Sequence, residues 1–428
     1  MHLMRIALVL GFALIAACAP AAAPAPTTVP TKPAATTAPA APTDAPKPAA
    51  EAAPAKPTDA TKPAAKEAPS AWLADYVAAS RNLKTDEAEF EKLKEAAKQE
   101  GKVTVAGPGF PGLRQGLIDG FQKAYGITVE YLGLGGGEVV TRVDREARAG
   151  VVSIDVNIGG TSTCWLMAER GYIRNAVEVV KDPALLNPEV WRGGTLRLIL
   201  PSPQTPKDFY CGVQAAEWVM TDLFVNSQIV KPESLSSWKD LLKPEYKGKI
   251  TSWDSRRPGS SQTTVGYLNA LFGEDYLKDL FIGQQVVLTA DYRQLAEWVA
   301  RGTYPIGIGL VQANIEQFRK EGLPLERLFP TDGQGSLTGG FGTVHPIKNS
   351  QNPNAGALFV NWFASKEAQE MWEREMMETS LRNDVPHRVP EYIIPKPGVE
   401  YPINDYYPNY FFEKRAPALA KLNDLLGR

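Results

Sequence analysis

Residues 102–132 read KVTVAGPGFPGLRQGLIDGFQKAYGITVEYL, and this stretch decides the fold class. Residues 102–106 indicate a short strand, because β-branched and small residues follow one another there. A glycine–proline loop comes next, and residues 113–126 carry apolar side chains at helical spacing. Residues 127–132 then indicate a second strand. A strand, a helix and a strand in this order predict parallel strands joined by a crossover helix.

The same alternation continues on both sides of this stretch. Residues 86–100 have helical spacing, and Gly101 is a stop signal for that helix. Two α/β units in series, with the chain returning late, predict two lobes joined by crossing segments, with a ligand cleft between them. We expect further strands at 155–160, 218–227, 249–254, 285–290, 304–310 and 341–347, and further helices at 138–149, 164–173, 263–273, 291–302, 312–322 and 353–377.

The first 70 residues differ in composition from the rest of the chain. Residues 1–17 have one basic residue and a short apolar run, which is typical of a secretory signal peptide. The run LIAAC, ending at Cys18, resembles the lipobox of bacterial lipoproteins, and this resemblance implies a lipid on Cys18; the alternative is an ordinary signal peptide with a chance cysteine. Residues 18–70 are mostly Ala, Pro, Thr and Lys, so we expect a disordered linker that tethers the body at 86–428.

The overall composition excludes several classes of function. The formal net charge is −2 and no long basic run occurs, so we expect no nucleic-acid partner. Three histidines leave little for zinc or for acid–base catalysis, and we expect no cofactor and no resident metal. Cys164 and Cys211 could pair in an oxidising compartment or stay as two separate thiols, and their spacing does not decide between the two.

Four segments of the body stand out together: KLKEAAKQEGKVTV (92–105), LFVNSQIVKPESLSSWKDLLKPEYKGKITSWDSRRPGSS (223–261), LAEWVARGTYPIGIG (295–309) and HPIKNSQNPNAGALFVNWFASKEAQEMW (345–372). In this order they resemble the extracellular solute-binding proteins of bacterial ABC importers, within the ferric-ion-binding and organic-anion-binding branch. This resemblance implies a type II periplasmic-binding-protein fold: two α/β lobes with a hinge, closure on a ligand, and delivery to a membrane permease and its ATPase by a monomer. We expect lobe 1 at about 100–210 plus 331–345, and lobe 2 at about 218–330 plus the C-terminal helices.

The loop GPGFPG at 107–112 has the spacing G-x-G-x-x-G, and Glu130 follows about 20 residues later, as in a dinucleotide fingerprint. That alternative would make the protein a secreted nucleotide-binding enzyme. Two prolines in the loop remove amide hydrogens that should approach a pyrophosphate. What remains is a tight loop at a helix start, which suits an anion, so Gly109 and Phe110 become candidate ligand contacts.

Polar residues follow several other predicted strands. Thr161 and Ser162 open a helix and either cap it or bind a ligand. Arg256 and Arg257 offer planar forks of donors for a carboxylate or phosphate, although one of them could instead face water or pair with Asp254. The remaining candidates, on the same reasoning, are Ser260, Ser261, Tyr292, Arg293, Gln312, Asn314 and, in the segment after the last long helix, Arg382.

We therefore expect a lipid-anchored solute-binding protein that captures a small organic anion and is not an enzyme. Ferric iron is the alternative cargo. Iron-binding relatives carry adjacent tyrosines where this chain has Asn314 and Ile315, so the resemblance disfavours iron. Tyr406 and Tyr407 form another tyrosine pair, but they lie outside the matching segments, and we expect them to pack at the surface. A passive surface or adhesion module is a third possibility, and it predicts no cleft.

Overall fold

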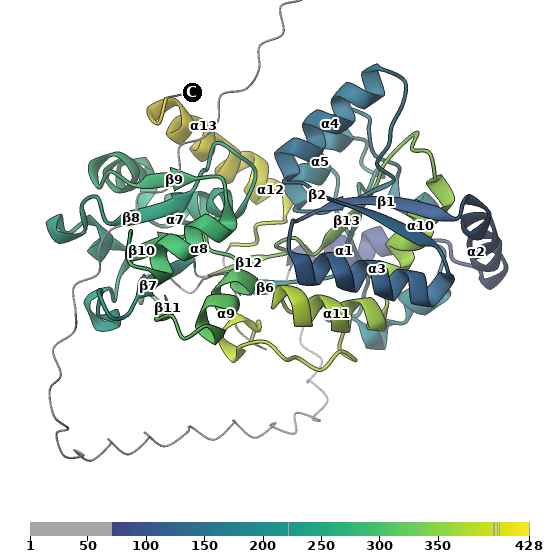
Figure 1. Ribbon diagram of the computed structural model, residues 1–428. Coiled ribbons are helices and arrows are strands. Elements are labelled where there is room, and N and C mark those ends of the chain that lie inside the picture. The colour runs from purple at the N-terminus through teal and green to yellow at the C-terminus, as the bar shows by residue number, and fades with distance from the viewer. Residues whose placement is uncertain are drawn as a thin grey trace, which may run out of the picture. The chain divides into compact units, whose positions relative to one another are not determined.

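The computed structural model describes residues 71–427, apart from 221, 334, 397, 398, 400 and 402 and the side chains of 71 and 72. The expected signal peptide at 1–17, the lipidated Cys18 and the linker at 18–70 lie outside the described residues. The described body forms two α/β lobes (Figure 1), which confirms the predicted fold class. No helix among the described residues has the length and apolar character needed to span a membrane.

Lobe 1 is built on a six-stranded sheet with the order β2-β1-β3-β13-β5-β4. The first βαβ unit forms as predicted, because β1 pairs in parallel with β2 and with β3. The late strand β13 joins the same sheet antiparallel to β3, which confirms that the chain returns to this lobe. The strands are β1 (Lys102–Gly107), β2 (Thr128–Gly133), β3 (Val156–Gly159), β4 (Arg197–Leu198), β5 (Val213–Gln214) and β13 (Thr343–Pro346).

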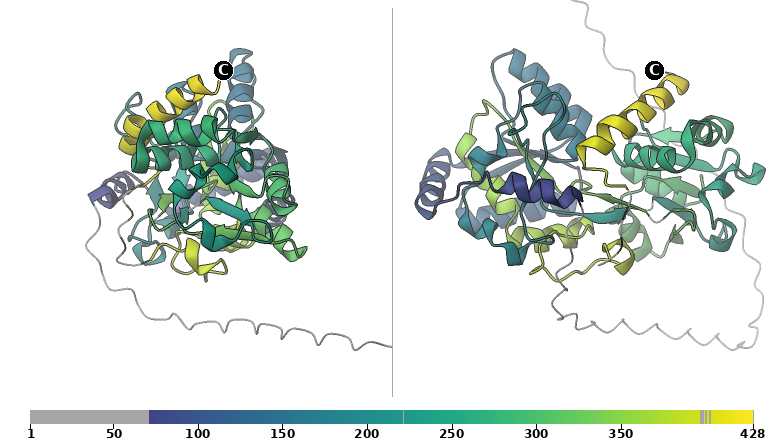
Figure 2. Two further views of the ribbon diagram at one scale, coloured as in Figure 1. Left: turned by 90° about the vertical axis from the view of Figure 1, so that its left-hand side faces the viewer. Right: turned by 180° about the vertical axis from the view of Figure 1, so that it is seen from behind.

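Eight helices belong to the described part of lobe 1. Helix α10 packs on α2, and α11 packs on α3, so both cover the first sheet. Helix α1 packs on β4 at the back of the molecule (Figure 2). The helices are α1 (Ala71–Ser80), α2 (Glu87–Glu100), α3 (Pro111–Tyr125), α4 (Gly136–Arg148), α5 (Thr161–Glu169), α6 (Ala176–Val179), α10 (Pro353–Phe363) and α11 (Lys366–Met376).

Two expectations about the C-terminal helices need correction. The helix expected at 353–377 is two helices, because the chain breaks at Ala364 and the Ser365 hydroxyl caps α11 by accepting from the Ala368 N–H. Both helices were assigned to lobe 2 and instead pack on lobe 1. All but the first two residues of α10 are buried, so its sequence shows that it is covered but not by which sheet.

Lobe 2 has a five-stranded sheet with the order β11-β7-β10-β8-β9. Strand β10 is parallel to β8 and antiparallel to β7. Helix α13 packs on α7 and so is the C-terminal helix that does cover lobe 2. The elements are β7 (Leu223–Asn226), β8 (Ile250–Trp253), β9 (Val287–Thr289), β10 (Ile306–Ile308), β11 (Leu325–Leu328), α7 (Ser260–Lys278), α8 (Tyr292–Ala300), α9 (Gln312–Lys320), α12 (Pro408–Tyr410) and α13 (Ala416–Leu425).

Short helical turns connect these elements. Two 3-10 turns, η4 and η5, follow Leu235 and begin at Trp238 and Pro244. Ser237 caps the first of them, as its position before Trp238 suggests. The turns are η1 (Pro183–Leu186), η2 (Pro188–Val190), η3 (Pro232–Ser234), η4 (Trp238–Leu242), η5 (Pro244–Tyr246), η6 (Asp279–Gly283), η7 (Glu391–Ile393) and η8 (Phe411–Arg415).

Three crossing segments join the lobes: the described residues of 215–222, 329–342 and 377–405. The strand expected at 218–227 is divided, because β6 (Trp218–Met220) pairs with β12 (Ser336–Thr338) between the lobes, whereas β7 belongs to lobe 2. The first and third segments run antiparallel, since the Glu217 N–H donates to the Thr379 carbonyl at 2.9 Å. The crossing is therefore a small hydrogen-bonded unit of its own.

A buried ionic network stands where the first crossing segment leaves lobe 1. The Glu217 carboxylate accepts from Arg197 Nη1 at 2.7 Å and from Arg192 Nη1 at 3.2 Å. The Tyr406 hydroxyl donates to the same carboxylate. Tyr406 is 2% exposed, so the expectation that it packs at the surface is wrong. A buried carboxylate needs such partners, and the tyrosine serves as one of them.

The two cysteines of the body form a disulfide. Cys164 on α5 is bonded to Cys211, which precedes β5, and their Cα atoms are 5.8 Å apart. The sequence left this pairing open, and the fold decides it because it brings α5 beside the segment that precedes β5. The bond fixes α5 to lobe 1.

Candidate ligand-binding site

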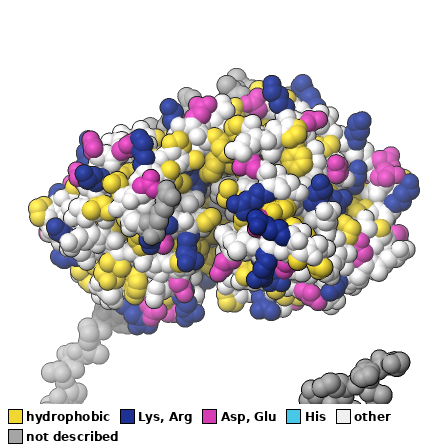
Figure 3. Space-filling model, turned by 90° about the horizontal axis from the view of Figure 1, so that it is seen from above, with side chains coloured by type: hydrophobic (Ala, Val, Ile, Leu, Met, Phe, Trp, Pro, Cys, Tyr) yellow, Lys and Arg dark blue, Asp and Glu magenta, His cyan; other side chains and the backbone are white. Residues whose placement is uncertain are grey.

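A cavity of about 1140 Å³ lies between the lobes, and both lobes and the crossing segments line it. Figure 3 shows Lys and Arg side chains gathered beside the furrow between the lobes. The first residues of six helices reach this cavity: α3, α4 and α5 from lobe 1, and α7, α8 and α9 from lobe 2. This follows from the topology, because the strands that precede these helices end at the same edge of each sheet.

In four of these helices the N-cap residue makes no hydrogen bond with a side chain, whereas Glu138 accepts from the N-cap N–H of α4 and Asp291 caps α8. The N-cap residues of the four are Phe110, Gly160, Gly259 and Val311, and none of these four makes a capping hydrogen bond through a side chain. The first backbone N–H groups of a helix have no partner within the helix, and the helix dipole places positive charge there. Two such ends from each lobe therefore face the cavity with donors suited to an anion.

Lobe 1 lines the cavity largely with backbone. A Cβ on Gly136 would lie 2.5 Å from Thr163 Oγ1, so the start of α4 packs closely on the start of α5. A Cβ on Gly137 would lie 3.3 Å from Cδ of Pro258 in lobe 2. The two lobes thus approach each other at this point, and glycine makes the approach possible.

Six arginines line the cavity, and three of them are held by carboxylates. Arg142 pairs with Glu146, Arg256 with Asp254 and Arg415 with Asp405. Burial opposes ionisation of Asp254, but the Arg256 guanidinium outweighs it and keeps the pKa of this carboxyl below its usual value. The other three form no salt bridge within the described part of the chain: Arg145, Arg257 and Arg293.

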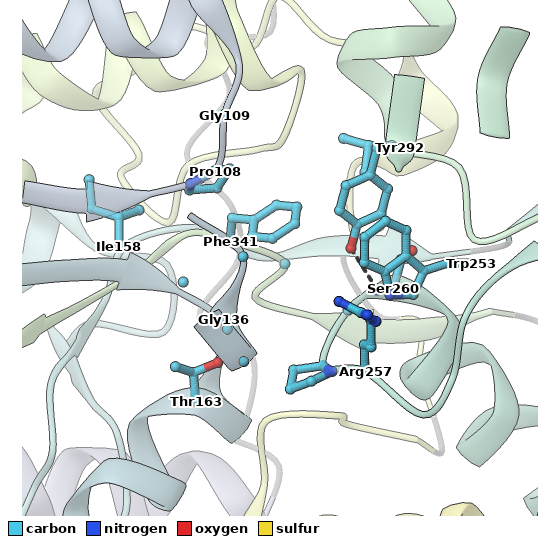
Figure 4. A pocket seen from close by; sticks show the side chains of 18 of the residues that line it. Pro108, Gly109, Gly136, Ile158, Thr163, Trp253, Arg257, Ser260, Tyr292 and Phe341 are labelled. Carbon is cyan, nitrogen blue, oxygen red and sulfur yellow. Dashed lines mark hydrogen bonds between the residues drawn. The ribbon is translucent and has the colours of Figure 1, made fainter. Parts of the chain in front are cut away.

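Aromatic rings form the middle of the cavity. The rings of Tyr292 and Trp253 stack at 3.7 Å with an 8° angle between their planes, and Arg257 lies beside them (Figure 4). Phe110 and Phe341 lie 6.5 Å and 6.0 Å from the Tyr292 ring between centroids. The Ser260 N–H donates to the Tyr292 hydroxyl at 3.2 Å, and burial raises the pKa of this phenol to about 12. Tyr292 is therefore neutral at physiological pH.

Most of the candidates chosen from the sequence lie at this cavity. Of the two neighbouring arginines, Arg256 pairs with Asp254, as the alternative interpretation of the sequence allowed. Arg257 forms no salt bridge among the described residues. Gln312 donates to Glu316 and accepts from Arg327, so its amide is partly occupied. The lining candidates are Gly109, Phe110, Thr161, Ser162, Arg256, Arg257, Ser260, Tyr292, Arg293, Gln312 and Asn314.

Two candidates do not line the cavity. The Ser261 side chain is fully buried, and its hydroxyl bonds to that of Ser252 at 3.0 Å. Helical rotation points it into lobe 2, away from the neighbouring Ser260. Arg382 lies in lobe 1, where it donates to Asp384 at 2.8 Å and to the Ala364 carbonyl at 3.0 Å. Both residues are therefore structural.

Several cavity residues were missed by sequence reasoning. The run Gly135–Gly137 at the start of α4 carried a signal, because three glycines before a helix allow close approach of backbone. Trp253 and Phe341 were interpreted only as parts of strands. Trp218 and Glu378 come from crossing segments, and no local pattern marks them.

Within the described ranges, no group of three or more His, Cys, Asp or Glu side chains is placed to hold a metal ion. His345 is buried in lobe 1, where it bonds to Asn157 and Thr343. Burial lowers the pKa of His345 to about 3, so it is neutral.

Residues 116–385 match the family model of bacterial extracellular solute-binding proteins. The chain belongs to this family. The match confirms the resemblance to extracellular solute-binding proteins that the sequence segments indicated.

Individual relatives of this solute-binding protein are distant. An uncharacterised protein of Haemophilus influenzae is 32% identical over 142 residues, which span 32% of this chain and 40% of that relative. The periplasmic binding protein AfuA of Actinobacillus pleuropneumoniae, with fructose-6-phosphate bound, has a TM-score of 0.59 at 20% identity, over 76% of this chain and 98% of its own. Iron-bound HitA of Pseudomonas aeruginosa has a TM-score of 0.56 at 17% identity, over 76% of this chain and 99% of its own. These structures share the two-lobed fold.

Proposed function

We propose that this solute-binding protein captures a small organic anion between its lobes and delivers it to an ABC permease and its ATPase. The observation that carries the proposal is the convergence of four uncapped helix starts, two from each lobe, on one cavity. Arg257 and Arg293 add charge at the same place without salt-bridge partners in the described chain. Fixed dipoles and free guanidinium groups together favour a carboxylate, phosphate or phosphonate.

The rings and the size of the cavity favour an organic ligand over a bare ion. A cavity of about 1140 Å³ is comparable to the pockets of about 300–1,000 Å³ that hold small molecules. The stacked Trp253 and Tyr292 rings, with Phe110 and Phe341 nearby, offer apolar surface to a carbon skeleton. The acid group would bind at the helix starts, and the skeleton would lie along the rings.

The fold neighbours include binders of different ligands, since one title names fructose-6-phosphate and another names iron. At this identity they share the fold, and the cavity must decide the ligand. Ferric iron needs negatively charged oxygen ligands. The carboxylates that line this cavity do not form a group of three or more among the described residues, and Arg415 holds one of them, Asp405. Arginines, helix starts and the neutral amide of Asn314 make up much of the remaining polar surface. We therefore propose an organic anion as the cargo.

Closure on the ligand follows from the contacts across the cleft. Pro258 of lobe 2 lies beside Gly137 of lobe 1, and Tyr292 of lobe 2 lies beside Phe110 of lobe 1. A ligand that touches both walls binds the closed state more tightly than the open one and shifts the population toward closure. The crossing segments would act as the hinge.

The remaining parts of the proposal concern the whole protein. We propose that it is a monomer, that it performs no catalysis, and that a lipid on Cys18 holds it at the outer face of the cell membrane or in the periplasm. Labelling with a radioactive fatty acid tests the anchor: the wild-type protein should incorporate label, and Cys18→Ser should not. Equal labelling of both proteins would exclude Cys18 as the lipidation site.

Isothermal titration calorimetry with ligand-free protein tests the cargo. The panel contains dicarboxylates, phosphate esters, phosphonates and ferric citrate, with sodium citrate as the matched control. We expect at least one organic anion to bind and to raise the melting temperature, because a ligand that binds only the folded state stabilises it. Binding of ferric ion alone would favour the iron alternative, and a panel without any stabilising ligand would favour a passive surface module.

A further inference from the structure

Five buried polar atoms on residues that line the cavity have no hydrogen-bond partner in the described protein, and Trp253 Nε1 and Arg415 Nε are two of them. The other three are Trp218 Nε1, Glu378 Oε2 and Asn314 Oδ1. The three residues are 7%, 2% and 7% exposed, and all of them line the cavity. A buried polar group without a partner is destabilising, so such groups are rare unless something binds them. A ligand is the natural partner for groups that face a cavity.

Two of these side chains lie close to Gly340. A Cβ on Gly340 would lie 2.6 Å from Glu378 Oε1 and 2.6 Å from Trp218 Nε1. Its φ of +53° is in the left-handed region that favours glycine. Because Gly340 has no side chain, an indole N–H and a carboxyl group can both lie close to the same point of the cavity wall.

Trp218, Gly340 and Glu378 belong to the crossing segments and to neither lobe. Trp218 is on the first segment, Gly340 on the second and Glu378 on the third. Burial raises the pKa of the Glu378 carboxyl to about 8 and outweighs the Phe341 backbone and the Trp372 side chain, which favour its ionised form. This carboxyl can thus both donate and accept at neutral pH.

The chemistry of the pair selects among ligand groups. An indole N–H only donates, so it needs an acceptor. An ammonium group has no acceptor to offer it. A second carboxylate or phosphate accepts from the indole N–H but has no hydrogen to donate, so the acceptor oxygen of the Glu378 carboxyl would stay unsatisfied. A methyl group would leave both side chains unsatisfied. A hydroxyl group accepts from Trp218 and donates to or accepts from Glu378, so it satisfies both.

Building on the anion capture proposed above, we propose that Trp218 and Glu378 form a subsite for a hydroxyl group of the ligand. The cargo is then a hydroxylated organic anion, of the sugar-phosphate or hydroxy-acid type. Its acid group binds at the helix starts, and its hydroxyl binds at the crossing segments. Asn314 on α9 offers its amide oxygen to a second hydroxyl of the same ligand.

Calorimetry with two matched pairs of anions tests this subsite and distinguishes the two ligand types. One pair is fructose 6-phosphate and hexyl phosphate, and the other is malate and succinate. We expect the hydroxylated member of one pair to bind at least about tenfold tighter, because a site built for a hydroxyl rejects an analogue that lacks it. Glu378→Leu and Trp218→Phe should each bring that ratio close to one. Glu378→Gln keeps an acceptor and should keep part of the preference.

The outcomes separate this inference from the function on which it rests. Equal binding within both pairs would overturn the hydroxyl subsite and leave anion capture standing. A preference that survives unchanged in Glu378→Leu and Trp218→Phe would also overturn it. The ratio of affinities within a matched pair does not change when a variant merely loses stability, because both anions are measured on the same protein. Failure of all four anions to bind, together with binding of ferric ion, would overturn the proposed function itself.

Discussion

The two walls of the cavity differ in how they present donors. Lobe 1 contributes the starts of α3, α4 and α5, where glycines bring backbone close to the cavity. Lobe 2 contributes side chains, above all Arg257, Arg293 and the stacked rings of Trp253 and Tyr292. Backbone donors are fixed and do not titrate, whereas arginines are mobile and must be ordered on binding. The comparison suggests a rigid wall that receives the anion and an adaptable wall that closes on it.

The rigidity of the first wall can be broken at its disulfide. Cys164 lies at the start of α5, and Cys211 lies 47 residues later in the same lobe. The double substitution Cys164→Ala with Cys211→Ala should lower the free energy of unfolding by about 2–5 kcal/mol, as is typical for native disulfides. Chemical denaturation measures it. Unchanged stability would show that packing alone holds α5 in place.

The charge of the second wall is tested by Arg257→Ala. Loss of a charge-assisted hydrogen bond costs about 1.5–3 kcal/mol, so the affinity for the anion should fall about 10- to 100-fold. The neighbouring Arg256→Ala is the matched control, because Asp254 already holds that guanidinium. Calorimetry compares the two variants. A larger loss for Arg256→Ala would reverse the roles of the pair.

Close approach of backbone in the first wall is tested by Gly136→Ala. The added methyl would lie 2.5 Å from Thr163 Oγ1, so the start of α5 must shift. Such overpacking costs about 1–3 kcal/mol, and we expect about a fivefold or larger loss of affinity for the anion. Gly109→Ala, where a Cβ meets no atom within 4 Å, should lose less. Equal losses would mean that close packing of α4 on α5 is unimportant.

The crossing segments belong to neither wall, and pH distinguishes them. Burial raises the pKa of Glu378 from 4.5 to about 8, so the folded state holds a proton that the unfolded state has released between these values. The resulting stability is fully present below about pH 4.5 and is lost as the pH rises to about 8. Asp222, with a pKa raised to about 7, adds to the same slope.

Thermal melts of wild-type protein and of Glu378→Gln between pH 5 and pH 8 measure this effect. The wild-type melting temperature should fall across the window, and the fall should be shallower in the variant. At any one pH, we expect the difference between wild-type protein and Glu378→Gln to be the smallest of the four predicted effects. Parallel curves for the two proteins would show that Glu378 titrates normally in the fold.

The sequence predicted the second wall better than the first. Arg257, Tyr292 and Arg293 follow strands directly, and charged or aromatic side chains at strand ends are visible in a sequence. The donors of lobe 1 are backbone groups, and only the spacing of glycines hints at them. Tertiary packing made Ser261 and Arg382 structural, and no local pattern could show which way they point.

The overall fold was largely predictable because strand and helix patterns alternate so regularly. One error in the predicted strands occurs where a single run of strand-forming residues pairs with two different sheets. Residues 218–227 read as one strand, but they pair with β12 in their first part and with β10 and β11 in their second. The buried polar groups of Trp218 and Glu378 come together only through the crossing of three segments. Their partnership depends on the folded topology, which residue type and spacing do not reveal.

The most direct test of the account is a crystal structure of the protein with the tightest-binding anion of the calorimetric panel. The account predicts that the acid group accepts hydrogen bonds from the first backbone N–H groups of α5 in lobe 1 and α7 in lobe 2, with the Arg257 guanidinium in contact. An acid group that lies outside the cavity, or one that touches the N–H groups of neither helix, would contradict it.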